Sequence, residues 1–166
     1  MVVPCMLAAG LQAEANAGTP AWGVPFINLM TDNHVDILLL PCCESTFQGP
    51  ATGSFRRKHG IDYYSGLLGY PEYCERQAIE TAEGIESLLS KYRIMAILGV
   101  EHSPTCAVKY MYSRSGMRKE PGIFMRKLME NLSRMNLEIP FLGINRKYPR
   151  KALLAMKTII QASKES

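Results

Sequence analysis

The chain has 166 residues, of which 47% are hydrophobic, 20% are charged and 8% are aromatic. This is ordinary globular composition, so a disordered tail, a collagen and a disulfide-stapled miniprotein are excluded, and the length predicts one domain over residues 1–166. The net charge of +4 is uneven, because residues 109–166 hold 13 of the 19 Lys and Arg residues but only 4 of the 15 acids. We interpret this excess as solvated helix faces in preference to a nucleic-acid surface.

The N-terminal stretch, residues 1–17, imitates a signal peptide because it is largely apolar and ends in Ala15-Asn16-Ala17. A signal peptide also needs a basic first region, and no Lys or Arg comes before Arg56. We therefore expect a buried strand followed by a loop, in a cytoplasmic protein. No apolar run reaches the roughly 18 residues that a membrane span needs, so no membrane partner is expected.

Further along the chain, short apolar runs alternate with amphipathic segments. Runs rich in Val, Ile and Leu predict strands buried on both faces, at residues 2–7, 35–40, 94–100 and 137–144. Helical spacing of apolar residues predicts helices at residues 25–31, 72–89, 123–135 and 150–163. This alternation implies βαβ units. We therefore predict a single Rossmann-like α/β domain, doubly wound in three layers, with a mainly parallel sheet of at least four strands.

Two polar segments, residues 43–70 and 109–119, are punctuated by Gly or Pro and show no clear period. Each comes after a predicted strand. Long excursions at that place are usually functional loops in compact domains, so we expect both segments to contribute to a site.

The five cysteines carry the most information. Their odd number argues against a disulfide scaffold in a chain of this size. Cys5, Cys42 and Cys106 each lie near the end of a predicted strand and close behind a proline. Because ligands bind outside the carboxyl ends of parallel strands, these three thiols are expected to converge on one point there.

Three converging thiolates suit a soft metal centre. Since no C-x-x-C knuckle and no fourth ligand is apparent, a [4Fe–4S] cluster with one iron open to substrate fits better than structural zinc. The alternative is that the cysteines are small buried hydrophobes at strand ends. Cys42 and Cys43 are adjacent and project in different directions, so only one of them is expected to be a ligand. Cys74 lies in the predicted helix 72–89 and is expected to pack in the core.

At these residues the sequence resembles the thiouracil desulfurase family. The resemblance covers about residues 1–145 and rests on three stretches, residues 5–10, 42–44 and 101–107. The family has Cys-Pro-Glu at the second stretch and Ser-Pro-Ser-Cys-Gly within the third. Here Cys43 replaces the proline, Thr105 replaces a serine and Ala107 replaces the glycine. The motif position favours Cys42 over Cys43 as the ligand.

The resemblance implies a desulfurase-like domain that removes sulfur without redox chemistry. Cys5, Cys42 and Cys106 would hold a [4Fe–4S] cluster as its metal ligands, and the open iron would bind the sulfur of a thiolated pyrimidine. Glu44 and Ser103 match the family's acid–base and proton-relay positions. The implied partner is a thiolated base or nucleoside; a thiolated tRNA base is compatible but not favoured. The oligomeric state is left open.

Other residues are weaker candidates. Phe55, Tyr63 and Tyr64 either stack on a pyrimidine or pack their loop down. Arg56 or Arg57 is a candidate to hold a substrate oxygen, and Asn145 to touch the ligand. Glu44 and Ser103 also have a purely structural interpretation, as turn and capping residues. His102 is given no role.

Two other functions fit the same residues. A sulfur-transfer enzyme would form a persulfide on one activated cysteine, with Glu44 or His102 nearby. The second alternative is a module that binds a nucleotide or base without catalysing a reaction. The sequence has no G-x-G-x-x-G motif and no Walker loop, which disfavours a phosphate-binding domain.

Overall fold

A computed structural model describes residues 1–7, 23–48, 60–145 and 148–165. Its longer helices are α1 (Gly23–Asp32), α4 (Tyr70–Leu89), α5 (Ile123–Arg134) and α6 (Arg150–Lys164). The short ones are a 3₁₀ turn η1 (Pro4–Met6), α2 (Cys43–Gln48) and α3 (Ile61–Gly66). The strands are β1 (Ile97–Val100), β2 (Met111–Ser113), β3 (Gly116–Arg118) and β4 (Phe141–Ile144). No helix in the described part of the chain is long and apolar enough to cross a membrane.

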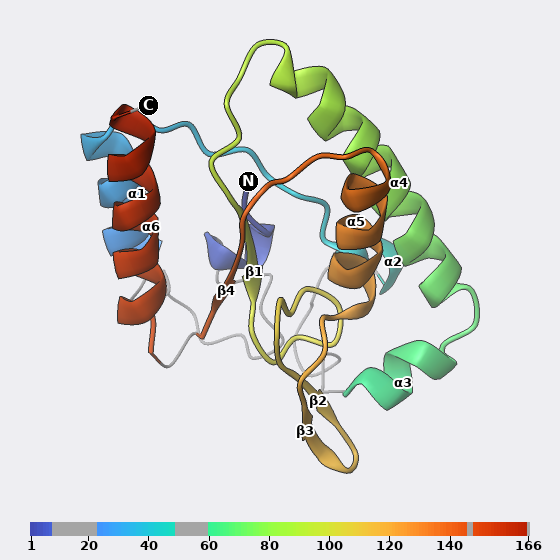
Figure 1. Cartoon of the computed structure of the whole chain (residues 1–166). Coiled ribbons are helices and arrows are strands. Elements are labelled where there is room, and N and C mark those ends of the chain that lie inside the picture. The colour runs from blue at the N-terminus through green and yellow to red at the C-terminus, as the bar shows by residue number, and fades with distance from the viewer. Residues whose placement is uncertain (8–22, 49–59, 146–147, 166) are drawn as a thin grey trace.

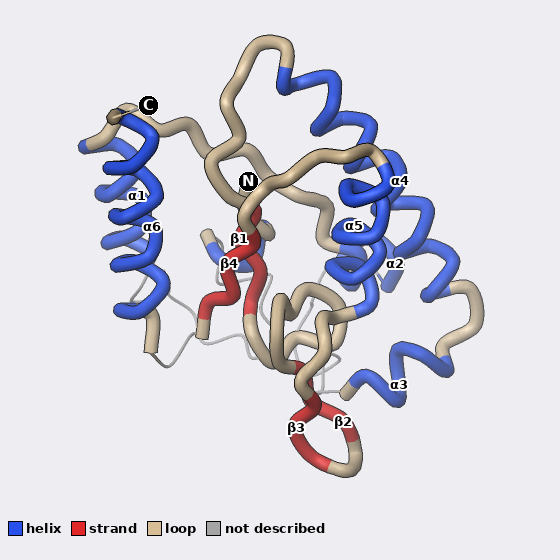
Figure 2. The backbone as a smooth tube through the Cα atoms, in the orientation of Figure 1, coloured by secondary structure: helices blue, strands red, loops and turns tan. Residues whose placement is uncertain are grey.

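The sheet differs from the one that the sequence predicts. Strands β1 and β4 pair in parallel, from Ile97 opposite Phe141 to Val100 opposite Ile144, and β2 and β3 form a separate antiparallel hairpin (Figure 2). The predicted strands 2–7 and 35–40 contribute only isolated parallel bridges, in which Val2 meets Leu39 and Leu98. The expected Rossmann-like, doubly wound domain with at least four parallel strands is therefore wrong.

Proline explains where these two predicted strands stop. Pro4 has no N–H to donate to a ladder and starts the 3₁₀ turn η1, so the extended backbone ends at Val3. Pro41 ends the other segment in the same way, and α2 begins two residues later. Between these points the backbone N–H groups of Val2 and Leu40 donate to Leu38 and Val2 at 2.9 and 2.8 Å. That is one bridge and too short for a strand.

The four longer helices follow the predicted pattern closely. In α4 the buried positions are Tyr70, Cys74, Ala78, Ala82 and Ile85, which lie on one face at helical spacing. In α5 the stripe is Phe124, Leu128 and Leu132. These apolar stripes drive the packing, because each must be removed from water against another element.

Figure 1 shows how the helices are arranged around β1 and β4. Helices α1 and α6 lie side by side on one side of the two strands, and α4 and α5 lie together on the other. The Lys164 ammonium donates to the Asn33 side chain at 2.8 Å, which joins the end of α6 to the end of α1. Lys127 of α5 pairs with Glu75 of α4 at 3.0 Å. The bases Arg126, Arg134, Lys157 and Lys164 are exposed, in agreement with solvated helix faces.

The two segments expected to be loops contain secondary structure. The described parts of residues 43–70 form α2 and α3, and residues 109–119 form the β2–β3 hairpin. Gly116, with a φ of 112°, and Gly69, with a φ of 78°, supply the left-handed backbone that these connections require. Both segments lie beyond the carboxyl ends of β1 or of the bridge-forming segment 35–40, so they bring side chains to that end of the molecule.

Candidate active site

The candidate site is built around the turn that follows β1. The Ser103 hydroxyl oxygen accepts hydrogen bonds from the backbone N–H groups of Thr105 and Cys106, at 3.2 and 3.0 Å. Pro104 fixes one backbone torsion within this turn. The Ser103 side chain therefore stabilises the backbone conformation of the turn that carries Cys106.

The start of α5 holds the same turn from the other side. The N–H groups of Ile123 and Met125 donate to the carbonyls of Pro104 and Thr105 at 2.9 and 3.2 Å. The buried hydroxyl of Thr105 shares a 2.7 Å hydrogen bond with the hydroxyl of Tyr70 in α4. Helices α4 and α5 thus help to determine the position of the Cys106 backbone.

Glu44 reaches this turn from α2. One carboxylate oxygen, Oε1, accepts a hydrogen bond from the Ser103 hydroxyl at 3.3 Å, and the other, Oε2, accepts one from the Tyr64 hydroxyl at 3.3 Å. Glu44 and Ser103 are both half-buried. The two residues that the sequence singled out for proton transfer are therefore in direct contact, although 59 residues separate them.

Cys42, just before α2, and Cys43, its first residue, have different surroundings. Cys43 is fully buried, and its thiol makes a hydrogen bond with Cys74 that, together with burial, raises its pKa. Cys42 is half-buried, and its carbonyl oxygen accepts from the N–H and hydroxyl of Thr46. This contrast supports Cys42 as the thiol that faces the site and places Cys43 and Cys74 in the core.

Cys106 is the most enclosed of the three candidate ligands, with 6% of its surface exposed. Burial raises the pKa of its thiol well above the ordinary value, and repulsion from the ionised forms of Cys5, Glu44, Cys42 and Cys74 raises it further. Electrostatic effects of this kind act between neighbouring groups. Cys5, in η1, Cys42, before α2, and the core residue Cys74 therefore all lie close enough to act electrostatically on Cys106. None of the five cysteines, all of which the structure describes, forms a disulfide.

The donor set fits an iron–sulfur cluster in type and number. Three thiols come from three different segments, and soft sulfur donors select iron–sulfur clusters and other soft metals. Within the described ranges, no group of three or more His, Cys, Asp or Glu residues is arranged to hold a metal ion. A cubane cluster, however, distributes its thiolates over different irons, which spaces them more widely than a single ion does. The elevated pKa of Cys106 also means that a bound cation would be needed to hold it as a thiolate.

The weaker candidates have mixed outcomes. Phe55, Arg56 and Arg57 lie outside the described residues. Tyr63 and Tyr64 pack edge to face with their ring centroids 5.2 Å apart, and Tyr64 is only 4% exposed, so Tyr64 packs down and contacts Glu44. Asn145 lies just past β4, with its amide nitrogen 3.4 Å from Nε2 of His102.

Two contacts at the site could not be read from the sequence. Tyr64 binds the Glu44 carboxylate, and Tyr70 binds Thr105 beneath the cysteine turn. Both tyrosines come from a stretch without a clear period, and neither is near its partner along the chain. The only signal was the density of aromatic residues in that stretch.

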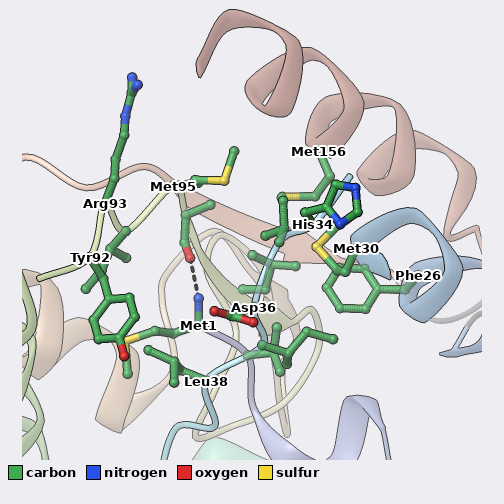
Figure 3. A pocket seen from close by; sticks show the side chains of 16 residues that line it. Met1, Phe26, Met30, His34, Asp36, Leu38, Tyr92, Arg93, Met95 and Met156 are labelled. Carbon is green, nitrogen blue, oxygen red and sulfur yellow. Dashed lines mark hydrogen bonds between the residues drawn. The ribbon is translucent and has the colours of Figure 1, made fainter. Parts of the chain in front are cut away.

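A cavity of about 440 Å³ lies at the opposite end of β1 (Figure 3). Phe26 and Met30 of α1, Met156 of α6 and the residues that precede β1 line it. In it the Met1 amine donates to the Ala96 carbonyl at 2.6 Å, and burial lowers the pKa of that amine to about 6. No candidate site residue lines this cavity, so it is separate from the cysteine site.

Comparisons with protein-family models, curated proteins and solved structures find no match to this chain.

Proposed function

We propose that the protein is an iron–sulfur-dependent desulfurase that converts a thiolated pyrimidine to its oxo form. One observation carries the proposal. The Ser103 hydroxyl donates to the Glu44 carboxylate and accepts from the Cys106 N–H, and Cys5, Glu44 and Cys42 act electrostatically on the enclosed Cys106 thiol. A carboxylate with a hydroxyl partner beside three thiols combines a proton acceptor with a binding place for a soft metal.

Cys5, Cys42 and Cys106 would hold a [4Fe–4S] cluster. When bound, such a cluster supplies a soft Lewis acid, which attracts a thiocarbonyl sulfur and withdraws electrons from the adjoining carbon. The overall reaction is a substitution in which one water and one C=S group give one C=O group and hydrogen sulfide. No electrons are gained or lost, so no reductant or oxidant is needed.

Glu44 takes a proton from the attacking water. The protonated Glu44 can then give that proton to the leaving sulfur. The carboxylate is held for this by the Ser103 and Tyr64 hydroxyls, one on each oxygen. Ser103 also accepts from the N–H groups of Thr105 and Cys106, so its hydroxyl hydrogen is directed to Glu44. Ser103 thus links the proton acceptor to the backbone of a cluster ligand.

The thiol surroundings favour this function over persulfide chemistry. A nucleophilic cysteine needs a lowered pKa, commonly from a neighbouring cation or a helix N-terminus. Burial and neighbouring negative charges instead raise the pKa of Cys106, and a thiol partner and burial raise that of Cys43. Neither is therefore activated as a nucleophile, whereas a bound metal would stabilise the Cys106 thiolate.

The test is sulfide release from 2-thiouracil and 4-thiouracil by protein reconstituted with iron and sulfide without oxygen. Changing Cys5, Cys42 or Cys106 to Ser should abolish both iron binding and activity. The matched control is Cys74→Ser, which should keep its iron because Cys74 contacts Cys43 in the core.

Glu44→Gln separates proton transfer from cluster binding. It should keep iron yet lose activity by about 10²–10⁴-fold, since Gln keeps the hydrogen-bonding reach but cannot take a proton. Ser103→Ala should lose less, because water can replace the hydroxyl. Full activity of Glu44→Gln with iron present would rule out the acid–base assignment. A wild type that holds four irons but releases no sulfide from any thiolated base would rule out the desulfurase.

A further inference from the structure

His102 has an unusual backbone for its residue type. It lies two residues past the end of β1, at Val100, with a φ of 71°, in the left-handed region that residues other than glycine rarely adopt. Its N–H donates to the Tyr110 carbonyl at 2.7 Å, and the next N–H, of Ser103, donates to Val100 at 3.2 Å. His102 is therefore the point where the chain leaves the strand and enters the Ser103 turn. Glycine would fit this backbone with less strain, so the imidazole itself needs an explanation.

The imidazole is held by two neighbours. Its ring lies over that of Tyr112, with centroids 5.0 Å apart and a tilt of 33°. Its Nε2 is 3.4 Å from the amide nitrogen of Asn145. An amide nitrogen only donates, so Nε2 must accept, and the proton of the neutral ring is then on Nδ1.

No acceptor for that Nδ1–H is found among the residues that the structure describes. Among the residues that the structure describes, Nδ1 is the buried side-chain nitrogen or oxygen that lacks a hydrogen-bond partner. A buried donor without an acceptor is unfavourable, and such a group in a native protein often marks a place for a ligand or water. A ligand that brings an acceptor to Nδ1 would remove this penalty.

The position of His102 connects this nitrogen with the candidate site. His102 lies beyond the carboxyl end of β1, and Asn145 follows β4, its parallel neighbour. Ligands of parallel sheets bind at that end. Ser103, the next residue, donates to Glu44, and Cys106 follows three residues later.

We infer that His102 determines substrate specificity: its Nδ1–H donates a hydrogen bond to the carbonyl oxygen that the thiolated pyrimidine carries besides its thiocarbonyl. This inference rests on the proposed desulfurase function. Thiouracils present such an oxygen. In 2-thiocytosine an amino group, which is a donor, takes its place at nearly the same size. His102 therefore selects thiouracil-type bases over thiocytosine-type bases.

The variant His102→Gly tests this selection. Glycine suits a φ of 71°, so the variant should be at least as heat-stable as the wild type. The wild type should prefer 2-thiouracil to 2-thiocytosine in kcat/KM, and the variant should reduce that preference by about tenfold, the effect of one hydrogen bond. The matched control is His34→Gly. His34 also has a positive φ, of 55°, but lines the cavity at the other end of β1, so its loss should leave the preference unchanged.

If His102→Gly is folded and keeps the wild-type preference, the inference is overturned. If the variant is less stable than the wild type, His102→Asn takes its place in the same comparison. Asn tolerates the left-handed backbone but is too short to reach the same acceptor. A preference that Asn leaves intact overturns the inference equally.

A second measurement does not depend on turnover. Nitrogen-15 NMR of the imidazole in the wild type should find the proton of His102 on Nδ1, and titration with uracil should shift that signal. A proton on Nε2, or a signal that uracil leaves unmoved, overturns the inference. If no thiolated base is desulfurised, the proposed function fails, while this titration still decides whether His102 binds a pyrimidine carbonyl.

Discussion

Strand β1 passes directly beneath the turn that carries Cys106, and Gly99 is the point of closest approach. A Cβ atom at Gly99 would overlap the Cys106 carbonyl oxygen and would lie 2.8 Å from Cε of Met125 and 3.0 Å from Cγ2 of Val108. The methionine end can rotate away, but the carbonyl belongs to the backbone. Restoring van der Waals contact in Gly99→Ala therefore requires the cysteine turn to move by about 1 Å.

The turn has no room for that movement, because α5 lies against its other side. A Cβ at Gly122 would be 2.6 Å from the Thr105 carbonyl oxygen and 2.8 Å from the Cys106 nitrogen, so this contact is already close. Overpacking a site that cannot relax costs about 1–3 kcal/mol. With backbone on both sides, we expect Gly99→Ala to lower the free energy of unfolding by about 2–3 kcal/mol.

Gly84 provides a control with the same chemical change and the opposite sign. It lies on the exposed face of α4, and a Cβ there would meet nothing within 4 Å. Gly84→Ala should raise the free energy of unfolding by about 0.5–1 kcal/mol, since alanine is the better helix former.

Urea denaturation followed by circular dichroism measures both changes. Iron content after reconstitution should fall only in Gly99→Ala, because only that change displaces Cys106. If Gly99→Ala were as stable as the wild type, the close packing of β1 against the turn would be refuted. If Gly99→Ala were destabilised but bound iron normally, iron binding would not depend on the position of Cys106.

Three further predictions concern single hydrogen bonds or ion pairs. Tyr64→Phe removes the donor to Oε2 of Glu44, so it should lower kcat for sulfide release about tenfold at unchanged iron content; an unchanged kcat would exclude an orienting role for this hydroxyl. Tyr70→Phe leaves the buried Thr105 hydroxyl without its 2.7 Å partner and should lower the free energy of unfolding by about 1–3 kcal/mol in urea titrations; wild-type stability would contradict this. Lys127→Met removes an exposed ion pair with Glu75 and should change stability by less than about 1 kcal/mol, so a larger loss in the same titration would mean that the pair is not solvated.

The sequence was sufficient for the four longer helices, but not for the short helices α2 and α3. The predicted helix 72–89 is α4, and the predicted helix 123–135 is α5, each within two residues at either end. A helix buries one face, and the repeat of apolar residues along the chain, such as Phe124, Leu128 and Leu132, records that face directly. The ends of the predicted strands 94–100 and 137–144 also agree with β1 and β4.

The sequence was not sufficient for the sheet. An apolar run shows that a segment is buried, but a strand also needs N–H and C=O groups that match those of a neighbour. Segments 2–7 and 35–40 have the apolar residues, and each has only one or two residues in register before a proline stops the pairing. Strand pairing depends on both partners, so the length of the paired stretch could not be predicted from either segment alone.

For the candidate site, too, the sequence predicted some features and only the tertiary structure showed others. The order of strand ends and cysteines along the chain predicted that Cys5, Cys42 and Cys106 would approach one another. The motif position already favoured Cys42 over Cys43. Only the tertiary structure placed Cys43 against Cys74, joined Ser103 to Glu44 and gave Glu44 its second partner, Tyr64. Periodicity reports which side of an element faces inward. Contacts between residues far apart in sequence depend on how elements pack, and no local pattern along this chain records that.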